Sequence, residues 1–125
     1  MNAKYNSIEL KSKALAIRIV RLAQFLQEEK HESTLSQQLL KSGTSVGASV
    51  KEATREASKD AFVDRINSAL DDLSHIEYLL EILNATGYIS DNAFGNIYDE
   101  NKEVEEQLMG ILRVTRNKAF AAASA

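Results

Sequence analysis

Apolar residues recur along the chain at alternating spacings of three and four, which is the pattern of helices that pack one face against their neighbours. The clearest seam comprises Phe62, Ile66, Ala69, Leu73, Ile76, Leu80 and Leu83. Similar seams begin at Ile8, Leu35 and Phe94, and the last of them carries a polar residue, Asn101, at a seam position. The pattern predicts four amphipathic helices near residues 5–30, 34–57, 59–85 and 91–118.

Residues that begin and end helices agree with this division. Ser33 or Thr34, Ser58 and Ser90 stand where N-caps are needed, and Gly87 can end the third helix. Connections this short force neighbouring helices to run antiparallel. We therefore expect an all-α fold, an antiparallel up-down-up-down four-helix bundle formed as one domain by residues 1–118, with a frayed tail at 119–125.

The composition supports a helical domain and excludes several kinds of chemistry. The 125 residues include no proline, no cysteine and only five glycines, so few residues interrupt a helix. Without cysteine there is no disulfide, thiolate nucleophile or iron–sulfur cluster. No leader-like segment and no apolar run of about 18 residues is present. We expect a cytoplasmic protein that binds no cofactor and no membrane.

The segment Gly43–Gly47 has the letters of the G-x-S-x-G nucleophile elbow, which would make Ser45 a nucleophile. That motif requires a preceding strand, and here a helical seam runs through the segment. The small residues have a second interpretation, because they let another helix approach closely. The residues that we assign to close helix packing are Ser42, Gly43, Ser45, Gly47 and Ala48.

Histidine and carboxylate pairs suggest metal or acid–base chemistry only weakly. Asp72 with His75, and Glu28 with His31, each resemble half of a di-iron motif. In the predicted bundle the two histidines lie roughly 15 Å apart along the axis, too far to share a metal pair. Glu77 and Glu81 lie one turn apart, but a solvated face or an ion pair is the commoner fate of such carboxylates. We expect no metal site and no enzymatic activity.

The distribution of charge says more than the net charge of −3. In the predicted topology one end of the bundle gathers residues 1–18 and 108–125, which carry +3 each, and residues 45–67, which carry no net charge, so this end carries +6. The opposite end carries −9. Basic residues supply the sequence-independent part of nucleic-acid affinity, and the candidates are Lys4, Lys11, Arg18, Arg113, Arg116 and Lys118. Alternatively, these cations complement helix dipoles and aid solubility.

The third helix carries more apolar surface than one seam needs. Tyr78, Leu79 and Ile82 extend its apolar residues around more than half of the helix. Another copy of the chain is the economical partner for this surface, so these three residues are the candidate oligomer interface.

The residues 39–53, LLKSGTSVGASVKEA, followed by Ser58, Phe62, Ala69 and the triplet Glu77-Tyr78-Leu79, resemble a known family. It comprises small four-helix bundle proteins encoded in intervening sequences of bacterial 23S rRNA genes, and it is similar to the accessory variability determinant proteins of diversity-generating retroelements. The resemblance implies a ring, a homopentamer in structurally known relatives, without enzymatic activity. The retroelement relatives bind nucleic acid and engage a reverse transcriptase.

Two functions remain open on this evidence. One is a ring-forming bundle whose basic end contacts RNA or DNA phosphates without sequence specificity. The alternative is a homo-oligomeric scaffold that binds proteins and no nucleic acid, with its acidic end (Asp99, Glu100, Glu103, Glu105 and Glu106) meeting a basic partner.

Overall fold

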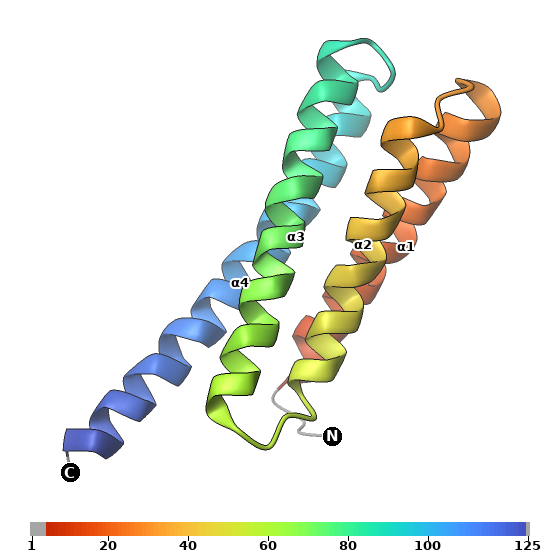
Figure 1. Cartoon of the computed structure of the whole chain (residues 1–125). Helices are drawn as coiled ribbons and strands as arrows, with labels where there is room; N and C mark the ends of the chain where they lie inside the picture. The colour runs from red at the N-terminus through yellow and green to blue at the C-terminus, as the bar shows by residue number, and fades with distance from the viewer. Residues whose placement is uncertain (1–4, 125) are drawn as a thin grey trace.

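Residues 5–124, which the structure describes, form four helices connected by short turns (Figure 1). They are α1 (Asn6–Glu29), α2 (Thr34–Ala53), α3 (Lys59–Ala85) and α4 (Asp91–Ser124). The computed structural model describes residues 5–124, with side chains for residues 5–117. The predicted all-α four-helix bundle is confirmed.

Contacts between the helices define their directions. Ser7 of α1 accepts a hydrogen bond from Gln107 of α4, whereas Arg18, farther along α1, pairs with the earlier residue Glu100. Residue numbers therefore fall along α4 as they rise along α1. Gln27 contacts Ser36 and Glu9 contacts Thr54, which gives α1 and α2 the same antiparallel relation. Each helix packs against two others, and α1 lies diagonally across the bundle from α3.

The core follows the predicted seams closely. All seven seam residues of α3 are buried, and so are Leu15, Ile19 and Leu26 of α1. Ala57, the last residue of the predicted second helix, is exposed. The reason is that α2 ends at Ala53, four residues before the predicted end, because the chain must turn before Ser58 can adopt the extended conformation that caps α3.

Most of the predicted helix boundaries have the expected caps. The Ser58 hydroxyl accepts the Ala61 amide at 3.0 Å, and the Ser90 hydroxyl accepts the Ala93 amide at 3.1 Å. Gly87 ends α3 in the left-handed region at φ +83°, and the next amide, that of Tyr88, donates to the Leu83 carbonyl at 2.9 Å. These contacts confirm the N-cap and C-cap predictions for α3 and the N-cap prediction for α4.

The predicted cap of α2 is right in its position, since Ser33 is the N-cap residue, but its side chain makes no capping hydrogen bond. Instead the carboxylate of Glu32 accepts the amides of Leu35 and Ser36, each at 2.8 Å. Glu32 is only 8% exposed, and its negative charge at the helix N-terminus is favourable both for the free amides and for the helix dipole.

The last helix extends farther than predicted. It continues to Ser124, beyond the expected end at residue 118, and its C-terminal part diverges from the other helices (Figure 1). The alanine-rich sequence after residue 118 has a high helix propensity, which accounts for helix where the sequence suggested fraying. The divergence opens one end of the bundle between α4 and the α2–α3 connection.

Candidate nucleic-acid interface

The small residues of α2 lie in two different environments. A Cβ atom added at Gly43 would lie 2.7 Å from Cγ2 of Ile19, closer than real contacts allow, so the glycine is what lets α1 approach. A Cβ atom at Gly47 would lie 3.9 Å from the Ser12 carbonyl oxygen, an ordinary contact. Ser42 is buried and Ala48 is exposed. Close packing thus centres on Gly43, while Gly47 and Ala48 border an open groove.

The nucleophile-elbow interpretation of Ser45 does not fit the structure. An elbow needs a strained turn between a strand and a helix. Residues 43–47 all lie inside α2, and Ser45 is a half-buried residue of a continuous helix.

The histidine and carboxylate pairs do not assemble into a metal centre. His31 and His75 are both exposed. Within the residues that the structure describes, no three histidine, aspartate or glutamate side chains lie close enough together to hold a metal ion.

Glu77 has a structural role between α3 and α4. Its carboxylate accepts the Tyr98 hydroxyl at 3.1 Å and pairs with the Lys102 ammonium at 3.0 Å. Partial burial, together with the hydrogen bond to Glu77, raises the pKa of Tyr98. The hydrogen bond to Glu77 raises the pKa of Lys102, against an opposing effect of burial. Glu77 is therefore committed to these two partners rather than to an acid–base pair with Glu81.

Two of the predicted phosphate-binding cations are neutralised within the chain. Lys11 pairs with Glu103, and Arg18 pairs with Glu100 at 2.9 Å. Lys11 and Arg18 lie seven residues apart and so form a stripe on α1. This stripe faces the acidic part of α4, so both cations pair within the chain instead of being presented together to a ligand. Lys4 and the side chain of Lys118 lie outside the described residues.

Arg113 and Arg116 keep their charge available at the end of α4. Both side chains are exposed and make no ion pair within the described part of the chain. Lys59, at the start of α3, shares these properties and lies at the same end. Sequence reasoning missed Lys59, although the antiparallel topology already placed the start of the third helix beside the end of the fourth.

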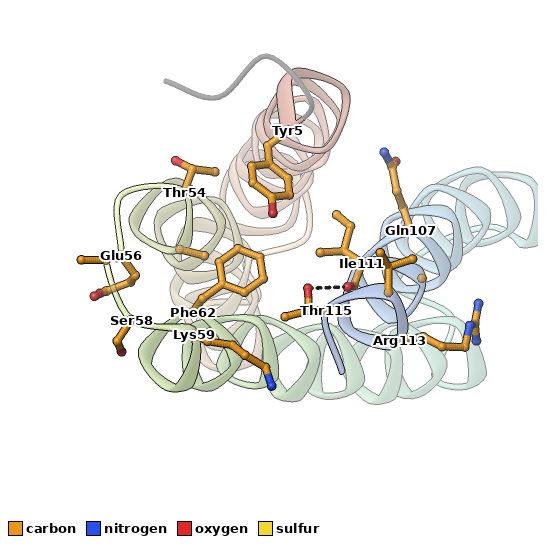
Figure 2. A pocket seen from close by; sticks show the side chains of 14 residues that line it. Tyr5, Thr54, Glu56, Ser58, Lys59, Phe62, Gln107, Ile111, Arg113 and Thr115 are labelled. Carbon is orange, nitrogen blue, oxygen red and sulfur yellow. Dashed lines mark hydrogen bonds between the residues drawn. The ribbon is translucent and has the colours of Figure 1, made fainter. Parts of the chain in front are cut away.

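Lys59 and Arg113 border a groove that opens where α4 diverges. Its volume is about 940 Å³, and it is lined by Tyr5, which precedes α1, by residues of α2, α3 and α4, and by the α2–α3 connection. In Figure 2 the rings of Tyr5 and Phe62, whose centroids are 5.6 Å apart, face Ile111 and Thr115 of α4, while Lys59 and Arg113 extend away from the ring pair. The groove therefore has an apolar interior, with the basic residues Lys59 and Arg113 and one acidic residue, Glu56, on its rim.

Residues 5–110 match the 23S rRNA-intervening sequence protein family. The chain belongs to this family. No curated protein matches it significantly. A solved structure from Bacteroides thetaiotaomicron VPI-5482, described as a protein of unknown function from the S23 ribosomal protein family, is 37% identical with a TM-score of 0.86. The similarity covers 88% of this chain and 98% of that one.

The predicted oligomer interface of this 23S rRNA-intervening sequence family member needs one correction. Leu79 is only 2% exposed, because the side of α3 on which it lies packs inside the bundle, so it belongs to the core. Tyr78 is 60% exposed and Ile82 is half-buried, so these two remain at the surface. None of the helices, over the described residues, combines the length and apolar character that crossing a membrane requires.

Proposed function

We propose that the protein is a non-enzymatic, cytoplasmic, homo-oligomeric bundle that binds RNA or DNA phosphates without sequence specificity at the end where α4 diverges. The observation that supports this function is that Lys59 and Arg113 border the groove, with Arg116 three residues after Arg113 on α4. All three cations are exposed and make no ion pair within the described residues. Lys11 and Arg18 contribute less than the sequence suggested, because Glu103 and Glu100 already neutralise them.

The chemistry of these residues suits a phosphate backbone. A guanidinium group donates in a planar fork that matches two phosphate oxygens, and an ammonium group acts as a compact charge. Three phosphate contacts give each copy a weak affinity that falls with added salt, with a slope of about −2.7 in log K against log salt for duplex DNA. The groove interior is apolar, and the rim cations extend away from its rings, so the site favours backbone contact over base recognition.

Oligomerisation would multiply this weak contact. The homopentamer implied by the family resemblance would carry five such ends on one particle, and a second contact on the same particle forms at a high effective concentration. The proposed ring thus explains how a chain with a net charge of −3 could still bind a polyanion.

A salt titration tests the nucleic-acid part. Fluorescence anisotropy with generic duplex RNA and DNA, from about 50 to 200 mM salt, should show weak binding that disappears in the triple variant K59Q/R113Q/R116Q. The matched control is K11Q/R18Q, which removes cations that are already paired and should bind nearly as the unmodified protein does. No binding at low salt, or equal loss in both variants, would overturn the assignment.

The alternative is a homo-oligomeric scaffold that binds proteins only, a reverse transcriptase being one such partner. One observation favours it: Asp60, Asp64 and Asp71 of α3 are exposed and form no ion pair within the described residues. The acidic residues first considered on α4 are less available, since Glu100, Glu103 and Glu105 pair with Arg18, Lys11 and Lys102. Co-purification with and without nuclease separates the two functions, because only the scaffold predicts partners that resist nuclease.

A further inference from the structure

The outer side of the α1–α2 pair carries an open apolar groove. One part of it is lined by Leu10, Ala16, Gly47 and Ala48, among others, and has a volume of about 670 Å³. A second part continues along α1 past Ile17 and shares Ala16 with the first. Leu10 is 69% exposed and Ile17 is 46% exposed, although both are large aliphatic residues. We call this surface the α1–α2 groove.

The rim of the α1–α2 groove is basic. Lys13 and Lys51 line its first part, and Arg21 lines the second. All three are exposed and without an ion-pair partner in residues 5–117. The one acidic residue among the lining residues, Glu9, accepts a hydrogen bond from Thr54 at 3.0 Å. The groove thus combines an apolar floor with positive charge.

The outer face of α3 has the complementary character. Asp64, Asp71 and Tyr78 follow one another at intervals of seven residues and so form one stripe along the helix. Ile82 lies one turn beyond Tyr78, and Asp60 lies one turn before Asp64. The three aspartates are exposed and unpaired over the described residues. We call this surface the α3 stripe.

The same asymmetry holds for the two halves of the chain. Residues 1–58 contain nine lysines and arginines against six acidic residues, whereas residues 59–125 contain six against twelve. The charge of the bundle is therefore unevenly distributed across its width, with the α1–α2 pair basic and the α3–α4 pair acidic, as well as along its length.

We propose that the α1–α2 groove of one copy receives the α3 stripe of the next copy. This inference rests on the homo-oligomer part of the proposed function and names the two surfaces that would meet. Because the two surfaces differ, the contact is heterologous, and its repetition closes a ring if the rotation between copies permits. A ring occupies both surfaces on every copy, which accounts for exposed leucine, isoleucine and tyrosine on a single chain.

The α1–α2 groove and the α3 stripe lie at the same level along the bundle axis, so they can meet when two copies have parallel axes. The rings of Tyr5 and Phe62 are in contact, which sets α1 and α3 at one level there, and both helices run in the same direction. Lys13 lies eight residues after Tyr5, and Asp71 lies nine residues after Phe62. At a rise of 1.5 Å per residue both lie about 12–14 Å above the ring pair. A copy displaced sideways without tilting therefore brings Asp71 to the level of Lys13.

Charge reversal tests the contact. Sedimentation velocity should show the unmodified protein as an oligomer at micromolar concentration, while K13E/K51E and D64K/D71K should each move towards the monomer mass of 13.9 kDa. Like charges facing each other across an interface are strongly unfavourable, so the dissociation constant should rise by about 100-fold or more. The matched controls are K30E, at the end of α1, and E106K, on α4; both reverse an exposed charge outside the two surfaces and should leave the oligomer intact.

Mixing the two double variants gives the decisive result. Each variant repels itself, yet K13E/K51E and D64K/D71K should associate with each other, because each then meets a surface of opposite charge. A ring of five cannot alternate throughout, so the mixture should form heterodimers and even-numbered assemblies instead of a closed pentamer. If both charge-reversal variants formed the same oligomer as the unmodified protein, this contact would be overturned while the homo-oligomer proposal would stand. An unmodified protein that is monomeric at every concentration would overturn both, and would indicate that the groove serves a different protein. Nucleic-acid binding by the Lys59, Arg113 and Arg116 end is measured separately and does not depend on either outcome.

Discussion

The α1–α2 contact and the α3–α4 contact hold the bundle together in different ways. Between α1 and α2, Gly43 receives the Ile19 side chain with no room for another carbon atom. Between α3 and α4, the contact includes polar bonds: buried Asn101 donates to the Leu73 carbonyl at 3.0 Å, and Tyr98 donates to Glu77. The α1–α2 pair also has hydrogen bonds near its two ends, from Gln27 to Ser36 and from Thr54 to Glu9. At its centre, however, shape fixes the separation of the helices, whereas directional bonds fix the register at the centre of the α3–α4 pair.

The largest expected effect comes from a substitution at Asn101, at the centre of the polar contact between α3 and α4. Asn101 is fully buried, and its side-chain oxygen has no hydrogen-bond partner in the described structure. Asn101→Asp keeps the shape but introduces a buried, unpaired carboxylate, which should cost about 3 kcal/mol or more in the free energy of unfolding at pH 7. The pKa of this carboxyl would be raised in the folded state, so the loss should diminish as the pH falls towards about 4.

Asn101→Leu is the matched control for that change. It removes the orphaned oxygen and adds apolar burial, so urea denaturation should show unchanged or increased stability, by up to about 1 kcal/mol. If the Asp and Leu variants were equally destabilised, the hydrogen bond to Leu73 and not the buried charge would be the dominant factor.

The next largest effect is expected from a substitution at Gly43, which disrupts the close packing of α1 and α2. Gly43→Ala places a carbon atom against Ile19, and overpacking costs about 1–3 kcal/mol, while the gain in helix propensity returns about 1 kcal/mol. We expect a net loss of about 1 kcal/mol by urea denaturation. Gly47→Ala, four residues later and facing the open groove, should gain up to about 1 kcal/mol from propensity alone. Equal effects at the two glycines would contradict the distinction between them.

These two glycines also show where sequence reasoning ends. The three-and-four spacing correctly placed the α3 seam, and local chemistry correctly placed the caps at Ser58 and Ser90, because both depend on neighbours along the chain. Which small residue of α2 touches α1 depends on helix rotation and separation, and Gly43 and Gly47 look alike in the sequence.

The candidate site was harder to predict for a related reason. A stripe containing Lys11 and Arg18 can be recognised from spacing, but not the acidic residues of α4 that face it. Pairing with Glu103 and Glu100 depends on which side of α1 meets α4. The same rotation decides that Leu79 is buried while its neighbour Tyr78 is exposed.

A smaller effect is expected from substitutions in the two turns, one connecting α1 to α2 and the other connecting α3 to α4. The α1–α2 connection places His31 at φ 56°, and the α3–α4 connection places Gly87 at φ +83°. A side chain in this left-handed region costs about 1 kcal/mol relative to glycine. Gly87→Ala should therefore destabilise by about 1 kcal/mol. His31→Gly should stabilise by about 0.5 kcal/mol after the entropy of the more flexible unfolded chain is included. Melting temperatures that shift in the same direction for both variants would contradict this comparison.

The smallest expected effect concerns pH and arises at the α3–α4 contact. The pKa of Tyr98 is raised in the folded protein, so above pH of about 10 the unfolded chain loses this proton first and stability falls. The raised pKa of Lys102 acts in the same direction: the stability it contributes is complete below about pH 10.4 and is lost as the pH rises further.

Urea midpoints measured at pH 8 and pH 10.5 should therefore fall less for Tyr98→Phe than for the unmodified protein. Tyr78→Phe is the matched control, because it makes the same chemical change at a tyrosine that is 60% exposed, and it should retain the full alkaline loss. Gly43→Ala should also retain it, since no titrating group takes part in that contact. An alkaline loss that Tyr98→Phe leaves unchanged would mean that the register of α3 and α4 depends on Asn101 and the apolar seam without the Tyr98–Glu77–Lys102 cluster.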